Sequence, residues 1–346
     1  RARYQAQKKE GSDSRERARI RFRLGGTSRV TDNVTVGFGL ATGGVDQRST
    51  NETLDNTFET PDIRLDYAYG TVKDVFGIGD VYMGKFLRGD VIWAPTDLMW
   101  DGDINPDGVG FVISKAILNN LDLFFNGGYL VLDESSSEPS DSGMSFYQPG
   151  FIWEAGQGIS LKGAVTYYDA HGVKGERLAN STEQSAGTNT GLSVSGSTIS
   201  GDLAYDYDVV NPQAELGFNI AAMMGLEDYA VNYFGLFGEY IENTDPETNN
   251  EGYIAGFKVG DKKVSNKGDW QVKGAWRKLE KDAVLDILPD SDFYSGKTGV
   301  KGYEAIVEYA LKKNLILGLD YYKTENIATG TTLEEELLQV DLLFKF

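Results

Sequence analysis

The sequence has no cysteine and no long apolar run. The absence of cysteine from 346 residues excludes a disulfide scaffold and thiol chemistry, and it is compatible with an oxidising compartment such as the periplasm. No segment approaches the ~18–20 consecutive apolar residues that a membrane-spanning helix needs. Any membrane-spanning part must therefore be a β-barrel, in which the strands satisfy one another's backbone groups.

Positive charge and histidine are also scarce. Lys and Arg number 33 against 52 Asp and Glu, and the net charge of −19 argues against a nucleic-acid partner. The single histidine, His171, ends a strand pattern and has no nucleophile motif beside it, so we expect a polar residue at a mouth and no enzyme. No signal peptide is visible before the strand-like opening at Arg1, which suggests a processed, truncated or disordered N-terminus.

The most informative segment runs from Arg15 to Gly25. Arginine occupies every second position, and Ala18, Ile20 and Phe22 stand between the arginines. A period of two indicates a β-strand with one charged and one apolar face. In a water-soluble sandwich the charged face would meet solvent, whereas in a membrane barrel it would line a wet interior.

Alternating segments of this kind recur along the whole chain. Counting residues 1–7 as the first, they number sixteen, although the alternation slips at 75–86 and 229–242. Short turns separate them at one edge and long polar loops at the other, which is typical of an outer-membrane barrel. We expect an all-β protein: one domain, 1–346, folded as a transmembrane antiparallel up-and-down β-barrel of about sixteen strands. Long loops are expected near 44–59, 88–107, 133–143, 170–200, 242–251, 280–300 and 325–334.

The strand after the first long loop is expected to place Tyr67 and Tyr69 outward, in a girdle of interfacial aromatic residues. Gly37 and Gly39, beside the arginine strand, would leave room for the arginine side chains.

The chain ends in an alternating strand, 338–346, that finishes on Phe346. This resembles the terminal strand of bacterial outer-membrane proteins, which implies recognition by the barrel-assembly machinery. The whole chain resembles the "putative porin" family of sixteen-stranded barrels, through its Arg-rich opening and a loop with Asp282–Val284 and Asp290–Phe293. The resemblance implies a location in the bacterial outer membrane, contact with its lipids and a homotrimer.

In general porins the third external loop folds inward and narrows the pore. The corresponding segment here is 87–107, in which aspartates alternate with bulky apolar residues. The resemblance implies a constriction, with the loop carboxylates opposite the arginines. Alternatively, the arginines pair locally with wall carboxylates and only keep the lumen polar. The candidate pore-lining residues are Arg15, Arg17, Arg19, Arg21, Arg23, Asp62, Arg64, Asp66, Asp90, Asp97, Asp101 and Asp103.

Two segments rich in acidic residues, 101–107 and 282–292, suggest further roles. Oxygen ligands alternate at Asp101, Asp103, Asn105 and Asp107, which makes a weak Ca²⁺ candidate, although Pro106 departs from the EF-hand pattern and turn chemistry explains the cluster equally. No other cofactor is implied. The acidic residues of 282–292 are expected to form a solvated loop edge that makes the outer mouth negative.

The leading functional hypothesis is a channel for passive diffusion of small hydrophilic solutes or ions. The arginines favour anions and the net charge favours cations, so we expect weak selectivity. The alternative is a barrel that acts as a sheath or scaffold for a surface complex, for example around an electron-transfer partner. Such a lumen would have no inward-folded loop.

Overall fold

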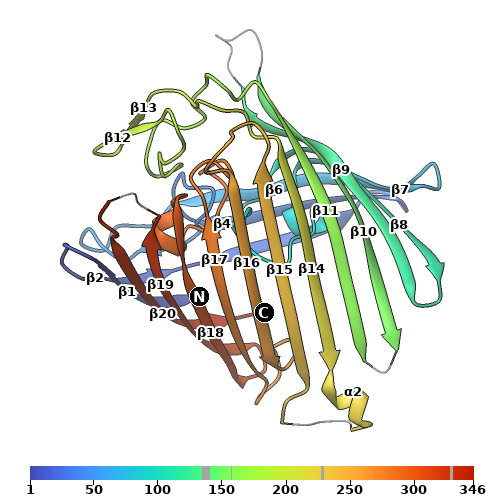
Figure 1. Cartoon of the computed structure of the whole chain (residues 1–346). Helices are drawn as coiled ribbons and strands as arrows, with labels where there is room; N and C mark the ends of the chain where they lie inside the picture. Colours follow the sequence, from blue (N-terminus) through green and yellow to red (C-terminus); the bar gives the residue numbers. More distant parts are fainter. Residues whose placement is uncertain (135–140, 157, 227–229, 328–329) are drawn as a thin grey trace.

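The computed structural model describes residues 1–134, 141–156, 158–226, 230–327 and 330–346, and it is almost entirely β-structure (Figure 1). Two short helices, α1 (Arg88–Val91) and α2 (Ile220–Met224), and one 3-10 turn, η1 (Phe293–Gly296), interrupt the strands. The strands are β1 (Ala2–Lys9), β2 (Arg15–Ile20), β3 (Arg23–Arg29), β4 (Val34–Thr42), β5 (Glu52–Thr53), β6 (Ile63–Val75), β7 (Gly79–Lys85), β8 (Asp107–Leu118), β9 (Leu121–Asp133), β10 (Ser142–Gly156), β11 (Ile159–His171), β12 (Ser193–Ser195), β13 (Thr198–Ser200), β14 (Val209–Asn219), β15 (Tyr233–Asn243), β16 (Glu251–Gly260), β17 (Trp270–Leu279), β18 (Val300–Lys312), β19 (Leu315–Asn326) and β20 (Glu334–Phe344).

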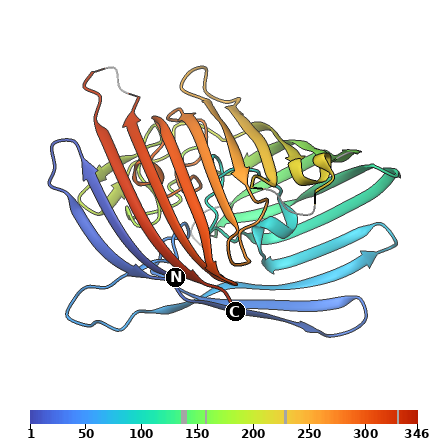
Figure 2. The ribbon, with the colours of Figure 1, turned by 90° about the horizontal axis from the view of Figure 1, so that it is seen from below.

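Consecutive strands pair antiparallel around the wall. The first strand, β1, pairs with β2 on one side and with the last strand, β20, on the other. The strand segments number twenty, more than the sixteen expected. Four of them add no new wall strand: β3 continues β2 after Arg21 and Phe22, and β5, β12 and β13 lie within long connections. Figure 2 shows the tilted strands from the short-turn end, with both termini close together.

The loop lengths follow the expected layout. Long connections gather at the end of the molecule that is uppermost in Figure 1, and short turns gather at the opposite end. The connection between β14 and β15 contains α2, with Asn219 capping its first turn and Gly225 ending it in the left-handed conformation. Within the described residues, no helix is long and apolar enough to cross a membrane.

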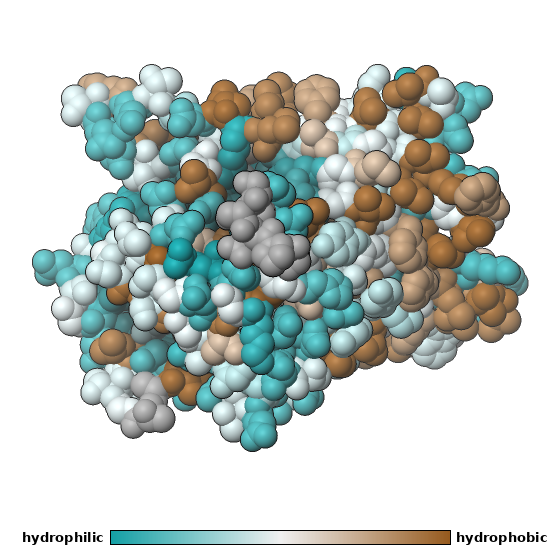
Figure 3. Space-filling model, turned by 90° about the horizontal axis from the view of Figure 1, so that it is seen from above, coloured by the Kyte–Doolittle hydropathy of each residue, from teal (hydrophilic) through white to brown (hydrophobic). Residues whose placement is uncertain are grey.

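The wall strands present apolar side chains outward and polar side chains inward. In β1, Arg3 and Gln5 are buried inside, whereas Tyr4 is exposed on the outer face. Figure 3, seen from the long-loop end, shows hydrophilic residues over much of the centre and hydrophobic residues gathered toward the right-hand side. This arrangement fits a wall with lipid outside and water inside.

The expected outward direction of Tyr67 and Tyr69 is wrong. The pairing of β4 with β6 shifts between Gly39 and Leu40, so Asp66 has no opposite residue and forms a bulge. The bulge turns Tyr67 and Tyr69 inward, and a Cβ atom on Gly39 would lie only 2.1 Å from the Tyr67 ring. The space beside the arginine strand therefore holds tyrosine rings, not arginine side chains.

Three long connections fold inside the barrel and form its hydrophobic core. Buried apolar residues of 86–104, 173–207 and 283–293 pack together and against inward-facing side chains of the wall, such as Phe146 and Ile241. Burial of each such side chain stabilises the docked loop by roughly 1.5–3 kcal/mol. The loops therefore form a packed body inside the barrel, in the half nearer the long-loop end.

Candidate functional site

The connection from β7 to β8, residues 86–106, crosses the barrel interior. It begins with α1 and continues through a segment in which Ile92, Leu98 and Met99 are buried. The indole Nε1 of Trp100 donates a hydrogen bond to the Tyr168 hydroxyl of β11 at 2.9 Å. Because the apolar side chains meet the inner wall, this loop lies inside the lumen, as the sequence indicated.

Polar contacts hold the same loop to wall strands across the lumen from the arginine strand. The Trp93 backbone N–H donates to Gln148 of β10 at 2.9 Å, and the Gln148 amide donates back to the Trp93 carbonyl at 2.8 Å. The Thr96 hydroxyl donates to Glu239 of β15. Asp97 forms an ion pair with Arg277 of β17 at 3.3 Å.

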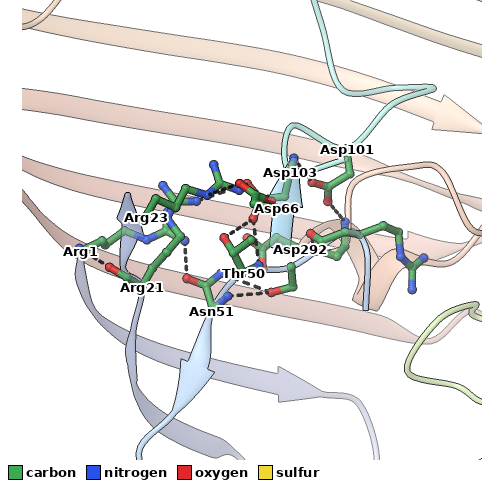
Figure 4. A network of polar contacts seen from close by, with 12 residues as sticks. Arg1, Arg21, Arg23, Thr50, Asn51, Asp66, Asp101, Asp103 and Asp292 are labelled. Carbon is green, nitrogen blue, oxygen red and sulfur yellow. Dashed lines mark hydrogen bonds and ion pairs between the residues drawn. The ribbon is translucent and has the colours of Figure 1, made fainter. Parts of the chain in front are cut away.

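The opposite side of the loop reaches the arginine strand through Asp103 (Figure 4). Asp103 forms ion pairs with Arg23 at 2.9 Å and with Arg21 at 3.3 Å. It also accepts hydrogen bonds from the backbone N–H and the hydroxyl of Thr50. Asp66 of the wall lies 3.6 Å from Arg23, so both pairing modes considered from the sequence occur at this arginine.

The loop carboxylates differ in their electrostatic surroundings. Burial alone would raise the pKa of Asp103, but Arg23 and Arg21 outweigh that effect and hold the pKa below its ordinary value. Burial raises the pKa of Asp101 well above its ordinary value, with further contributions from Asp290 and Asp103. Asp101 accepts backbone hydrogen bonds from Ser291 and Asp103, so it joins two inward loops.

Among the described residues, no carboxylate pairs with the remaining arginines of the row. Arg19 donates to the Gln5 side chain at 3.3 Å and to the Asn51 carbonyl at 3.0 Å, and Arg17 donates to Gln7 at 3.4 Å. Arg15 lies opposite Gln7 in the pairing of β1 with β2. The row therefore has two parts: Arg21 and Arg23 pair with aspartate, whereas Arg17 and Arg19 donate to neutral oxygen atoms.

Arg1, just before β1, and Arg3, within it, belong to the same inner surface. The Arg3 guanidinium donates two hydrogen bonds of 2.7 Å to Asp341 of β20 and lies 3.0 Å from Asp292. Arg1 lies 3.1 Å from Asp341. The sequence places both arginines on the face of the arginine row, but their carboxylate partners, Asp341 and Asp292, are more than 280 residues away and could not be recognised from it.

The other candidate residues lie apart from this cluster. Arg64 donates to loop carbonyls, including those of Asp46 at 2.7 Å and Ser49 at 2.9 Å, and thereby holds the connection between β4 and β6. Asp90 accepts a hydrogen bond from the Tyr69 hydroxyl at 3.3 Å. Asp62 is exposed in the loop before β6.

The acidic run after β17 is not a solvated edge, and that expectation is wrong. Asp282 and Asp286 are each 2 % exposed and accept hydrogen bonds from the loop before β14, at Thr190 and Thr188. Asp290 lies 2.7 Å from Arg277. Burial and the neighbouring Asp97 nevertheless raise the pKa of Asp290 to about 7.

The apolar residues of this second inward loop could have signalled its position. Ala283 and Val284 are fully buried, and Phe293 packs beneath the Arg277 guanidinium, 3.5 Å from the ring centre. The motif residues 282–284 and 290–293 are thus the residues that anchor the loop inside the barrel.

A cavity of about 490 Å³ lies between the crossing loop and strands β3, β4 and β6. Its polar lining includes Arg23, Asp66, Arg88, Asp90 and Asn105. Burial lowers the pKa of Arg88, which begins α1 in the crossing loop. One cationic and one anionic side chain, Arg23 and Asp66, therefore reach the cavity from the wall, and Arg88 and Asp90 reach it from the loop.

The calcium candidates face different partners. Asp101 and Asp103 have the contacts given above, the Asn105 amide donates to Asp66 at 3.3 Å, and Asp107 pairs with Lys85 at 3.0 Å. The described part of the chain contains no group of three or more His, Cys, Asp or Glu residues that could hold a metal ion. Calcium binding stays a prediction, and it would require these side chains to leave their partners.

His171 lies at the outer end of β11, where its Nε2 atom is 3.1 Å from the Ser145 hydroxyl. Strand pairing brings this serine close across 26 residues, which the sequence argument missed. Asp169 is 3.7 Å from Nδ1, beyond hydrogen-bonding distance. Tyr129 stacks on the imidazole, and all four residues lie on the outer face of the wall.

Comparison with known proteins agrees with the architecture. The model of the family described as "Putative porin" matches residues 2–195 and 178–346. A search of curated proteins found no match. Among solved structures, a triple mutant of the Rhodopseudomonas blastica porin is similar, with 13% identity over 98% of this chain and 96% of that chain and a TM-score of 0.46. A loop-deletion mutant of OmpT, an outer-membrane protein of Vibrio cholerae, has 12% identity over 98% and 95% of the two chains and a TM-score of 0.48. Because the family model covers nearly every residue, the chain belongs to the putative porin family.

Proposed function

We propose that this protein forms a water-filled channel in the bacterial outer membrane, through which small hydrophilic solutes or ions diffuse passively. The observation that carries the proposal is the inward position of residues 86–106 between the arginine row and the opposite wall. Such a loop narrows a lumen without removing its polar lining. The route would pass the cavity beside Arg23 and Asp66.

The opposed charges at this position would impose a transverse field on the solute. Beside the cavity, Arg23 and Asp66 come from the wall, and Arg88 and Asp90 come from the loop. A field of this kind orients water and dipolar solutes and disfavours apolar ones. The proposed transport involves no chemical step and no cofactor.

Planar-bilayer recording of the purified chain tests the proposal. We expect stepwise, ohmic conductance in KCl and a measurable reversal potential in a salt gradient. Replacement of Arg19 or Arg21 by alanine should move that potential toward cation preference, because each change removes a positive charge from the lumen. Absence of conductance would overturn the channel, and identical potentials in all proteins would show that the arginine row does not select ions.

The inward loop speaks against a sheath around an electron-transfer partner, because a sheath needs an unobstructed lumen. Very large conductance, insensitive to loop substitutions, would favour the sheath instead.

The expected partners follow from the same proposal. Outer-membrane lipids would contact the exposed apolar face of the wall, which includes Leu123, Val165 and Leu319. The barrel-assembly machinery would recognise the last strand, where Phe346 is 94% exposed. A homotrimer is expected from the family, and crosslinking in the native membrane tests it.

A further inference from the structure

The arginine row carries more positive charge than its neighbours neutralise. Within the described residues, carboxylates lie within 4.0 Å of Arg21 and Arg23, whereas Arg17 and Arg19 have none within that distance. In the described part of the chain, their hydrogen-bond acceptors are the side-chain oxygen atoms of Gln7 and Gln5 and the backbone carbonyl of Asn51. Two adjacent guanidinium groups on one face repel each other unless an anion stands between them.

Asp292, Glu335 and, for Arg19, Glu52 of β5 act on these arginines from a distance, and the first two are engaged elsewhere. Asp292 is held by Arg3 at 3.0 Å. Glu335 is held by Lys9 at 3.1 Å and accepts a hydrogen bond from the Ser295 hydroxyl. Neither can swing to Arg17 or Arg19 without abandoning a partner of its own.

Unused hydrogen-bonding atoms gather at the same place. The Nε atoms of Arg17 and Arg19 are buried, and no described residue offers them a hydrogen-bond partner. In the same cross-strand row, Gln339 pairs with Gln5, and Gln5 pairs with Arg17. The Gln339 side chain is fully buried, and both of its amide atoms also lack a partner.

The position of this group suits a solute that enters from outside. The chain runs from the long-loop end through Arg15, Arg17 and Arg19 to Arg23, where the crossing loop docks. Successive inward residues of a strand are about 6.7 Å apart. An anion held at Arg17 and Arg19 would therefore lie between the long-loop end and the narrow region, one or two inward residues along the strand from the latter.

We propose that Arg17 and Arg19, held by Gln7 and Gln5, form a binding subsite for small oxyanions, either carboxylates or inorganic phosphate. Guanidinium groups bind both classes through paired N–H donors. The subsite rests on the proposed channel for its role in transport, but binding itself does not depend on conductance. Arg21 and Arg23 serve instead to dock the loop through Asp103.

The test uses the full chain in detergent and in bilayers, with succinate and inorganic phosphate as probes. Isothermal titration at low ionic strength should show binding of at least one probe. Arg17→Gln and Arg19→Gln should each weaken it about ten- to hundredfold, the loss expected for one hydrogen bond between charged groups. Preference between the two probes identifies which oxyanion class the subsite takes.

Arg29→Gln is the matched control, because Arg29 belongs to the same inward row but pairs with Asp32 at the short-turn end. It should bind both probes as the parent does, and circular dichroism should show that all three variants keep the β-fold. Absence of binding by the parent, or equal binding by all variants, would overturn the subsite. Binding without bilayer conductance would uphold the subsite and refute the channel.

Discussion

Replacement of Asp103 by asparagine is the sharpest perturbation of the crossing loop. The change keeps an oxygen acceptor for Thr50 but removes the charge that pairs with Arg21 and Arg23. A hydrogen bond to a charged group contributes about 1.5–3 kcal/mol. Because the Arg23 side chain is 36% exposed, its share is reduced by solvent screening. We therefore expect a loss of about 2–3 kcal/mol, which shifts the docking equilibrium about 30- to 150-fold.

The absence of native cysteine makes this shift measurable. A single Met99→Cys substitution places a thiol at a site that is 1% exposed when the loop is docked. Thiol labelling should be about 30- to 150-fold faster when Asp103→Asn is added, in proportion to the undocked fraction. Asp62→Asn, which changes an exposed carboxylate in a neighbouring loop, should leave labelling unchanged. Equal labelling rates with and without Asp103→Asn would refute the docking role of this ion pair.

Two further predictions concern protons and packing. Burial raises the pKa values of Asp101 and Asp290, the latter to about 7, so their protonated forms favour docking, and this stabilisation is lost as pH rises through each raised pKa. The labelling rate of the same thiol, divided at each pH by that of free cysteine because the thiolate fraction also rises with pH, should increase from pH 6 to pH 9, and Asp101→Asn should flatten this profile. Gly39→Ala should destabilise the barrel by about 1–3 kcal/mol, because the new methyl group would overlap the Tyr67 ring. Gly70→Ala, where a Cβ atom meets nothing within 4 Å, should cost much less in thermal unfolding, and equal effects would contradict the inward position of that ring.

The wall could be predicted from the sequence because its signal is local. Each strand alternates between lipid and lumen, so a period of two is readable without knowledge of distant residues. Arg15 to Arg23 is the clearest example: five residues of one type fix the inward face of β2 and β3. The crossing loop is also recognisable from the sequence, because large apolar side chains such as Trp93, Leu98 and Trp100 favour burial over exposure to water.

The sequence predicts the wrong position for a side chain where a single bulge residue or a contact with a distant loop decides that position. A single bulge at Asp66 reverses the direction of Tyr67 and Tyr69, and nothing in the local alternation marks it. The acidic run has the composition of a solvated loop, and its partners, Thr188 and Thr190, come from another loop nearly a hundred residues earlier. Side-chain pairing between loops has no period, so only the folded chain reveals it.

Many carboxylates of this protein hold the inward loops in place, so the net charge of −19 does not predict the charge of the lumen. Asp103 and Asp292 are each matched by arginines of the wall, and Asp286 is buried among hydrogen-bond donors of another loop. These carboxylates serve the packing of the inward loops and offer little charge to a passing ion. Within the part of the chain that the structure describes, the arginines of the row without a carboxylate inside 4.0 Å are Arg15, Arg17 and Arg19, so the charge left there is positive. Because short-range charge outweighs groups beyond a Debye length of about 8–10 Å, an acidic protein can present a locally cationic vestibule.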